Sequence, residues 1–224
     1  MLAVIDLTPR MRRVTVVAES MRGVPIRPAQ DLELLLRESS GRRVKRRYTI
    51  RSARPEAGEL DLDVLLHGDT PGSGWAIGAR PGDEVEFQGP RGKLTLRPAR
   101  AHLLLGDESA LPAIAAICEA LPDQEPATAL IEVDGPDDHL PVAAHTHWVH
   151  RDGSPAGQPD LLRAALETVD VSPGAHGYLM GESRAMIALR SDLERRGVDH
   201  ESIFVKGYWN VGRPDRLAGR APAR

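Results

Sequence analysis

The pattern of the sequence changes at Arg97 and Pro98, and this change constrains the fold more than any other feature. Before it, short runs of β-branched and apolar residues are separated by Gly and Pro, and several alternate with period two, which predicts an antiparallel β-barrel or sandwich. After it, strand-like runs alternate with helix-like segments, which predicts a parallel sheet with helices on its faces. We therefore expect two domains, residues 1–98 and residues 99–224, and the length of 224 residues suits this division.

The individual runs predict the following elements. In the first domain we expect strands at 14–17, 32–36, 48–50, 60–66 and 83–87, with the Gly-Pro-Arg-Gly segment 89–92 as a break. In the second domain we expect strands at 103–105, 129–133, 146–150, 177–180 and 202–206 and helices at 111–121, 160–169 and 184–196. The single cysteine, Cys118, excludes a disulfide within the chain and falls where a small buried helix residue is expected.

Composition argues against several classes of protein. The formal net charge of −3 does not favour general attraction to nucleic acid or to an anionic membrane. No run approaches the roughly 20 apolar residues of a membrane helix, and the N-terminus lacks the pattern of a signal peptide, so we expect a cytoplasmic protein without membrane insertion. Positive charge gathers in one early stretch, which is either a phosphate site or a solvated strand edge: Arg42, Arg43, Lys45, Arg46, Arg47 and Arg51.

The first candidate site lies inside this basic stretch. Strand alternation places Arg46, Tyr48 and Ile50 on one face and Thr49 and Arg51 on the other. A guanidinium suits a phosphate, an aromatic ring suits a ribose or ring system, and a hydroxyl suits a heteroatom edge. Exposed strands also use such residues for cross-strand pairing, so the pattern alone leaves both interpretations open.

The second candidate site is the glycine-rich segment 67–76, which follows a strand and leads into a short helix. Its glycines let backbone N–H groups approach an anion, and a helix N-terminus favours negative charge. We expect Ser73 to cap the helix and to bond a phosphate oxygen. The alternative is a plain connection in which Trp75 fills the core.

Two strand-to-helix turns of the second domain are candidates for contacting a dinucleotide. The turn within 104–112 lacks the three glycines of the Rossmann fingerprint, so an ordinary capped turn is the favoured interpretation of the sequence alone. Asp107 and Glu108 are poor neighbours for a phosphate, and we expect them near a nicotinamide ribose or amide. The turn that begins at Gly181 and Glu182 is expected to form the wall of the same pocket, with Arg184 as an anion contact.

Four histidines close together in the chain raise the question of a metal site: His139, His145, His147 and His150. Their spacing does not match a standard structural site, and neither a Cys-x-x-Cys nor a His-Glu-x-x-His pattern accompanies them. We expect a hydrated loop that leads into a strand through Trp148, and no metal site.

Taken together, the motifs resemble those of the siderophore-interacting proteins, which are FAD-dependent ferric siderophore reductases within the ferredoxin-reductase-like flavoenzymes. Order and spacing match over nearly the whole chain. The matching motifs are Arg46-x-Tyr48-Thr49-x-Arg51, Leu66-His67-Gly68, Gly72-Ser73-x-Trp75-Ala76, Pro81-Gly82-Asp83, Gly89-Pro90-x-Gly92, Gly106-Asp107-Glu108-Ser109-Ala110-Leu111-Pro112-Ala113, Gly181-Glu182-Ser183 and Gly207-Tyr208-Trp209.

The resemblance implies roles for individual residues. Arg46 would contact the FAD pyrophosphate, Tyr48 would pack on the flavin, and Thr49, the expected catalytic residue, would lie beside the reactive edge of the isoalloxazine. The segment 67–76 would hold the remaining phosphate and the adenosine. The implied cofactor contacts are Arg46, Tyr48, Thr49, Arg51, His67, Gly68, Gly72, Ser73, Trp75 and Ala76 from the barrel, and Gly106, Asp107, Glu108, Ser109, Ala110, Gly181, Glu182 and Trp209 from the α/β domain. Candidate contacts for an anionic ferric complex are Lys206 and Arg213.

The function implied by the resemblance is electron transfer from NADH or NADPH through FAD to the ferric iron of a siderophore. Ferrous iron is then released, because the hard oxygen donors of a siderophore hold ferric iron far better. Two alternatives stay open. One is a related flavin reductase that serves a protein electron carrier or takes electrons from a deazaflavin or ferredoxin, and the other is a binding protein without catalysis.

Three features qualify the resemblance. Asn210 stands where family members often carry Arg, which we expect to affect substrate affinity rather than flavin binding. The family usually has an additional strand before the point near Thr8 where the match begins, so we expect residues 1–6 or a partner to protect the barrel edge. No basic cluster suits a 2′-phosphate, which favours NADH or a donor that is not a nicotinamide.

Overall fold

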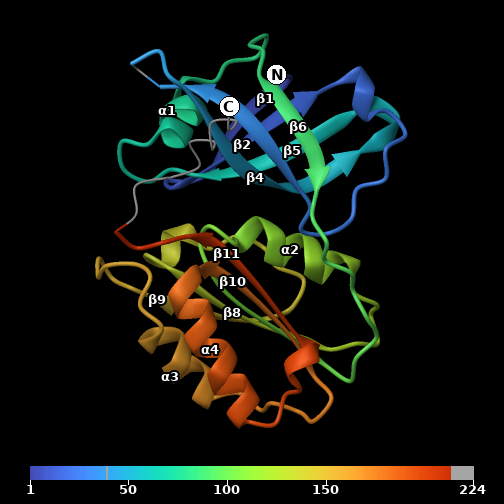
Figure 1. Ribbon diagram of the computed structural model, residues 1–224, viewed down its shortest axis with the longest axis vertical. Helices are drawn as coiled ribbons and strands as arrows, with labels where there is room; N and C mark the ends of the chain where they lie inside the picture. Colours follow the sequence, from blue (N-terminus) through green and yellow to red (C-terminus); the bar gives the residue numbers. More distant parts are fainter. Residues whose placement is uncertain (39, 213–224) are drawn as a thin grey trace, which may run out of the picture. The chain divides into compact units, whose positions relative to one another are not determined.

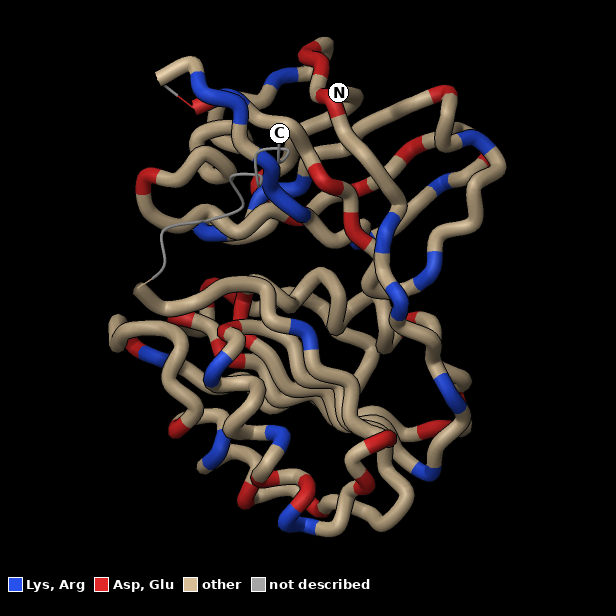
Figure 2. Tube along the Cα trace, viewed as in Figure 1, with Lys and Arg blue, Asp and Glu red and all other residues tan. Residues whose placement is uncertain are grey.

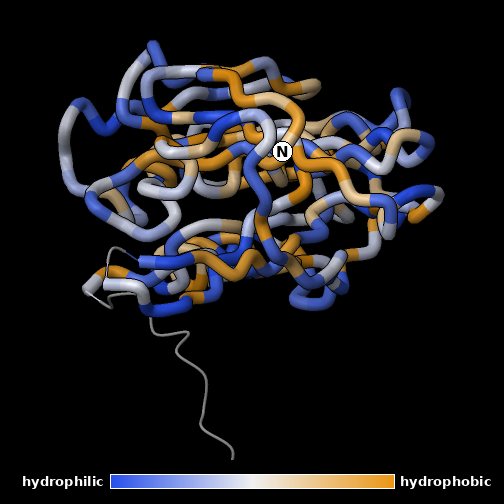
Figure 3. The backbone as a smooth tube through the Cα atoms, turned by 90° about the horizontal axis from the view of Figure 1, so that it is seen from above, coloured by the Kyte–Doolittle hydropathy of each residue, from blue (hydrophilic) through white to orange (hydrophobic). Residues whose placement is uncertain are grey.

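The computed structural model describes residues 1–38 and 40–212 of the chain. These residues form two compact units, one built from residues 1–26 and 30–92 and the other from residues 27–29 and 93–211 (Figure 1). Lys, Arg, Asp and Glu are interspersed over both units (Figure 2), and the projecting loops are mainly hydrophilic (Figure 3). The expected division at residue 98 stays a prediction.

The N-terminal unit is an antiparallel sheet with one helix. Its strands are β1 (Ala3–Thr8), β2 (Met11–Val17), β3 (Asp31–Arg37), β4 (Arg43–Arg54), β5 (Glu59–Leu65) and β6 (Glu86–Arg91), and they pair in the order β1-β2-β5-β4-β3-β6. Strand β4 is long enough to pair with β3 over its first half and with β5 over its second half. The helix α1 (Pro71–Gly78) packs near β3 and β5, and short 3₁₀ turns occur at Glu19–Met21 and Pro55–Ala57.

Alternation of side chains builds the core of this unit. Leu32 and Leu34 of β3, Ile50 of β4 and Leu62 of β5 point inward and are fully buried, whereas residues between them carry charge. Ala76 of α1 joins the same cluster. The expectation of an antiparallel, period-two first half is confirmed.

One expectation for this unit needs correction, and another is met. Residues 83–87 were expected as a strand with Gly89 and Pro90 beyond it, but β6 is Glu86–Arg91 and includes both. Strand β6 lies at the edge of the sheet, where a proline that cannot donate a backbone hydrogen bond is tolerated. The other edge is β1, so the N-terminal residues themselves pair along β2, which is one of the two ways in which we expected that edge to be protected.

The C-terminal unit is a parallel sheet with helices on both faces. Its strands are β7 (His102–Asp107), β8 (Ala127–Val133), β9 (His145–His150), β10 (His176–Glu182) and β11 (Ile203–Trp209), in the order β11-β10-β7-β8-β9. Helices α3 (Asp160–Glu167) and α4 (Ser183–Arg195) pack on one face, and α2 (Leu111–Ala120), which carries the buried Cys118, packs on the other. Short 3₁₀ turns occur at Pro136–Asp138 and His200–Ser202.

The C-terminal elements agree with the sequence expectation in order and type, but three strands run past their expected carboxyl ends. Strand β7 extends to Asp107, strand β10 to Glu182 and strand β11 to Trp209, so residues expected in a turn or beyond the last strand lie within the sheet. In a parallel sheet the carboxyl ends of all strands meet at one edge. The turns after β7, β8 and β10 therefore come together there.

Candidate functional site

The inner face of β4 carries the first part of the predicted cofactor site. Arg46 is paired with Leu34 of β3, and Tyr48 is paired with Leu32, so both side chains lie on the face that carries the core. Both are half-buried, and Arg46 Nη1 donates to the carbonyl of Lys45 at 2.8 Å. Thr49 is buried on the opposite face, and Arg51 is half-buried.

Tyr48 meets the first turn of α1, which brings the two predicted halves of the site together. A Cβ atom added at Gly72 would lie 1.9 Å from the hydroxyl of Tyr48, so only glycine fits beside that ring. The ring of Tyr48 also lies 5.9 Å from that of Trp75, tilted by 30°. The first turn of α1 thus lies directly against Tyr48, so the two predicted parts of the cofactor site adjoin.

The loop before α1 is capped differently from our expectation. Thr70 is the N-cap residue, and its side chain accepts from Ser73 N at 3.3 Å. Ser73 Oγ is buried and is used within the loop, where it accepts from His67 N at 2.9 Å and donates to His67 O at 3.0 Å. The expectation that Ser73 caps the helix was wrong, because the threonine three residues earlier is placed to do so. Ser73 therefore shapes the loop, and its contact with a phosphate stays a prediction.

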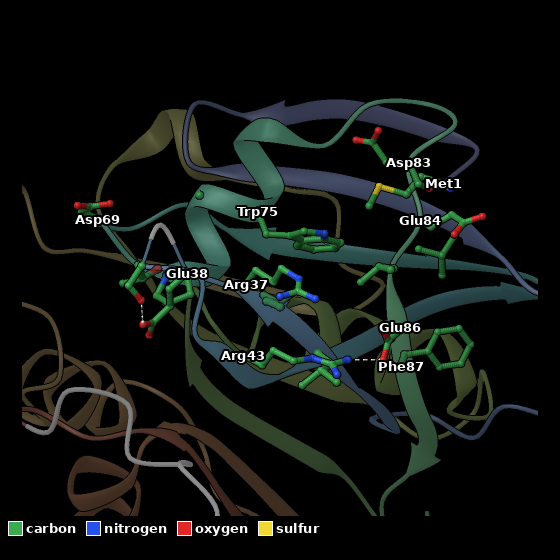
Figure 4. A pocket seen from close by; sticks show the side chains of 18 of the residues that line it. Met1, Arg37, Glu38, Arg43, Asp69, Trp75, Asp83, Glu84, Glu86 and Phe87 are labelled. Carbon is green, nitrogen blue, oxygen red and sulfur yellow. Dashed lines mark hydrogen bonds and ion pairs between the residues drawn. The ribbon is translucent and has the colours of Figure 1, made fainter.

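A cavity of about 970 Å³ lies beside α1 in the N-terminal unit (Figure 4). Trp75 points into it, and the buried indole Nε1 of Trp75 has no hydrogen-bond partner among the described residues. Val16, Leu36 and Phe87 supply apolar lining, and the ion pair between Arg43 and Glu86 lies at its side. Charged residues, among them Arg37 and Glu84, line the rest of the cavity. An unpartnered donor in a cavity with both apolar and charged lining is a feature of ligand sites.

In the C-terminal unit, Asp107 at the end of β7 is fully engaged by the protein. Its Oδ1 accepts from Ser109 N at 2.9 Å and from Ser109 Oγ, and its Oδ2 accepts from Glu182 N at 2.9 Å and from Trp209 Nε1 at 2.8 Å. The side chain is 6 % exposed. Asp107 therefore joins three of the predicted site residues, and each of its oxygens already accepts two hydrogen bonds.

Glu182, at the end of β10, also uses its carboxylate to accept hydrogen bonds from backbone N–H groups of the protein. Its Oε2 accepts from Arg184 N and Ala185 N at 2.6 and 2.8 Å, so this carboxylate caps α4. Its Oε1 accepts from Val211 N at 3.1 Å. Arg184 thus supplies a backbone N–H to Glu182, whereas we expected its side chain to contact an anion.

A third group of buried charges surrounds Arg151, which follows β9 and is 4 % exposed. Its guanidinium lies 3.1 Å from Glu108 Oε1, 3.4 Å from Glu132 Oε1 and 3.6 Å from Asp134 Oδ1. Burial raises the pKa of Glu132 to about 7, and the nearby carboxylates of Asp107 and Glu108 act in the same direction while Arg151 opposes them. The carboxyl edge of the sheet therefore holds more buried negative than positive charge.

The remaining predicted residues are placed as follows. Gly106 lies within β7, and Ala110 lies in the turn after it, close to Gly106. Lys206 lies in β11 with its ammonium 5.0 Å from the ring centre of Tyr208. Arg213 lies outside the described residues.

Of the histidines, His139 stacks on Trp148 with ring centres 4.3 Å apart and meets His150 through their Nε2 atoms at 2.8 Å. Over residues 1–38 and 40–212, no group of three or more His, Cys, Asp or Glu side chains is arranged to hold a metal ion.

Sequence reasoning missed Thr70, Glu132 and Arg151. Thr70 carried an available signal, because a threonine directly before proline and three residues before serine is a good N-cap. Glu132 and Arg151 carried none, since their contact depends on β8 and β9 being neighbours in the sheet.

Comparison with known proteins agrees with this arrangement. An antiparallel sheet is followed in the chain by a parallel α/β unit, and a family model matches each of the two parts. The family model described as siderophore-interacting FAD-binding domain matches residues 31–94, and the model described as siderophore-interacting protein matches residues 99–212. The chain belongs to the siderophore-interacting protein family, and its N-terminal unit contains the family's FAD-binding domain.

Individual relatives show the same likeness. The chain is 36 % identical over 180 residues to the ferric vibriobactin reductase ViuB of Vibrio cholerae, a match that spans 76 % of this chain and 66 % of that protein. It is 39 % identical over 189 residues to an uncharacterized protein of Mycobacterium tuberculosis, spanning 77 % of this chain and 67 % of the other. The chain thus spans about two thirds of these relatives.

A solved structure gives a further match. The siderophore utilization protein from T. fusca superposes with a TM-score of 0.85 at 31 % identity, over 95 % of this chain and 92 % of that one. Among the described residues, no helix has the length and apolar character needed to cross a membrane.

Proposed function

We propose that this chain is a cytoplasmic ferric siderophore reductase, in which FAD passes electrons from NADH or NADPH to siderophore-bound ferric iron. The observation that carries the proposal is the contact of Tyr48 with Gly72 at the N-terminus of α1, inside the segment that matches the family's FAD-binding domain. The similarity to ViuB, a protein named as a ferric vibriobactin reductase, supports the substrate class.

The residues of the N-terminal unit fit FAD. Arg46 supplies a cation beside Tyr48, and Tyr48 lies against the first turn of α1, so these residues together suit a pyrophosphate and the ring next to it. Arg51 adds a second cation further along β4. The cavity beside α1, which has charged and apolar lining and the unpartnered indole N–H of Trp75, suits a heteroaromatic ring such as adenine.

Other residues of this unit act on the shape of the site. His67 and Gly68 begin the loop, and the hydrogen bonds between His67 and Ser73 fix it ahead of α1. The buried Ala76 anchors α1 on the core, and its carbonyl accepts from Arg12 at 3.1 Å. Preorganisation of this kind reduces the ordering cost of binding a large nucleotide.

A nicotinamide nucleotide gives up two electrons at once, whereas each ferric ion accepts one. FAD, when bound, would supply the change from two-electron to one-electron transfer. We assign Thr49 to the reactive edge of the flavin, as the family resemblance implies. Lys206 and Arg213 are the cations that we assign to an anionic ferric complex. No protein side chain needs to bind the iron directly, because the siderophore supplies the ligands until ferrous iron leaves.

An anaerobic assay of the purified, FAD-loaded protein tests the proposal. NADH or NADPH is added first and the absorbance of oxidised flavin is followed, and a ferric siderophore is added next in the presence of a chelator that reports ferrous iron. The proposal expects loss of flavin absorbance and then ferrous iron. Loss of absorbance only with dithionite, followed by ferrous iron, would keep the reductase and reassign its electron donor to a protein or deazaflavin.

A further inference from the structure

The carboxyl edge of the parallel sheet is the place where α/β proteins of this kind usually bind an anionic nucleotide, because backbone N–H groups and helix N-termini point there. In this chain six of the backbone N–H groups at this edge donate to side-chain carboxylates. Side-chain carboxylates accept from the following backbone groups at this edge: Ser109 N, Asp134 N, Glu182 N, Arg184 N, Ala185 N and Val211 N. The accepting side chains are Asp107, Glu108 and Glu182.

The glycines of these turns do not leave room for a ligand either. In dinucleotide sites the missing side chain lets a pyrophosphate approach the backbone. Here a Cβ atom at Gly181 would lie 2.6 Å from Asp107 Oδ2, and one at Gly106 would lie 2.5 Å from Met180 O and 2.9 Å from Ile114 Cδ1. Both glycines thus accommodate protein atoms.

Among the described residues, buried carboxylates outnumber buried cations at this edge. Arg151 is the buried cation, and its guanidinium already contacts three carboxylates, among them Glu108. Arg184, at the start of α4, is exposed, so solvent screens its charge. The carboxylates are buried, at 5 % exposure for Glu108 and 1 % for Glu182, so solvent screens them weakly. A diphosphate brought to this edge would therefore meet like charge.

We infer that the carboxyl edge of this sheet does not hold the pyrophosphate of a dinucleotide, because the carboxylates of Asp107 and Glu182 already accept from backbone N–H groups that would bind an anion there. The protein then recognises the electron donor through the nicotinamide end of the donor alone. The inference rests on the proposed function, in which a reduced nicotinamide nucleotide supplies the electrons. Glu182 is the specificity-determining residue, since its carboxylate accepts from the backbone N–H groups at the N-terminus of α4, where a phosphate would otherwise bind.

Direct binding measurements test this inference without requiring catalysis. ADP-ribose, which carries the pyrophosphate without a nicotinamide, is titrated calorimetrically into the FAD-loaded protein and into two variants. Glu182→Gln removes the charge and keeps an acceptor for α4, and Glu182→Gly removes both. Glu201→Gln is the matched control, because Glu201 is exposed and precedes β11 at the opposite edge of the sheet.

We expect no saturation of the native protein or of the Glu201 variant at millimolar ADP-ribose, and affinity at least ten times higher in Glu182→Gly, with Glu182→Gln between them. Saturation of the native protein at micromolar ADP-ribose would overturn the inference. So would Glu182 variants that retain FAD and bind ADP-ribose no better than the native protein. The proposed function fails by a different result, namely a reduced, FAD-loaded protein that releases no ferrous iron.

Discussion

The indole of Trp209 donates from Nε1 to Asp107 Oδ2 at 2.8 Å and so ties the end of β11 to the end of β7, with β10 between them. The same oxygen accepts from Glu182 N on β10, so one carboxylate joins three strands. Because the bond is partly buried, its loss leaves a donor that water reaches only in part.

Asp107→Asn tests this relationship. An amide cannot accept at both of its ends, so at least one of the donors that now reach Asp107 is left unpaired, and we expect the free energy of unfolding to fall by about 1–3 kcal/mol. Unfolding in urea is followed by the fluorescence of Trp209 in a background with Trp75 and Trp148 replaced by Phe. Ser109→Ala is the control, since it removes one hydrogen bond to the same carboxylate and keeps that of Trp209. Equal stability of Asp107→Asn and the parent protein would contradict the role given to Asp107.

Gly72→Ala tests the predicted FAD site. The new Cβ would collide with the hydroxyl of Tyr48 at 1.9 Å, so Tyr48 must move and we expect FAD affinity to fall at least tenfold. Gly74→Ala is the matched control in the same helix, because nothing lies within 4 Å of its added Cβ. The measurement is fluorescence titration of each apoprotein with FAD.

A second substitution tests whether the lost FAD affinity comes from the collision between the added Cβ and the hydroxyl of Tyr48. Replacing Tyr48 by Phe in the Gly72→Ala protein removes the hydroxyl and leaves ring carbon Cζ at 3.3 Å from the added Cβ, so part of the lost affinity should return. FAD affinity of the Gly72→Ala protein equal to that of the native protein would show that Tyr48 and the first turn of α1 do not form the cofactor site.

Glu132 gives a prediction for pH. Burial raises the pKa of its carboxyl from the ordinary value of 4.5 to about 7 in the folded protein. The folded state therefore keeps a proton that the unfolded chain releases, so this contribution to stability is present at pH 4 and is lost as the pH rises through 7. Glu132→Gln lacks this loss, and between pH 5 and pH 8 we expect it to gain stability relative to the native protein by about 2–3 kcal/mol.

Thermal or urea unfolding at a series of pH values measures this difference. Glu201→Gln serves as a control for the loss of one exposed carboxylate. Parallel stability curves for the native protein and Glu132→Gln would show that Glu132 has an ordinary pKa in the folded state.

Donor kinetics give a further prediction. Because we infer that the sheet edge does not hold a pyrophosphate, reduced nicotinamide mononucleotide should reduce the bound flavin nearly as well as NADH does, with kcat/KM values within about tenfold, a range of about 1.4 kcal/mol. NADPH should fall in the same range, since no contact with the 2′-phosphate is expected. Stopped-flow measurement of flavin absorbance compares the three donors. A preference for NADH of several hundredfold over the mononucleotide would contradict the prediction.

The sequence predicted the order of elements well, because hydrophobic periodicity and Gly/Pro breaks are local signals. It misplaced β6, since Gly89 and Pro90 read as a break when their place at a sheet edge is unknown. It identified Tyr48 and Gly72 as members of one site through motif spacing, but their contact depends on how α1 packs on the sheet.

The predicted site residues of the C-terminal unit show more clearly what the sequence alone could not predict. Asp107 and Glu182 were expected to contact a nucleotide, and the sequence could not reveal that their oxygens accept from neighbouring backbone N–H groups. The ion pairs of Arg151 join residues from the ends of three parallel strands, so they follow from strand order and not from any local pattern.

The most direct measurement is a single-turnover experiment on the FAD-loaded protein. The bound flavin is reduced anaerobically with one equivalent of dithionite and mixed with excess ferric siderophore, and flavin reoxidation and chelator-trapped ferrous iron are followed together. We expect flavin absorbance to return as about two ferrous ions appear per flavin, because each ferric ion accepts one electron. Flavin that stays reduced in the presence of the ferric siderophore, with no ferrous iron trapped, would show that the protein is not a ferric siderophore reductase.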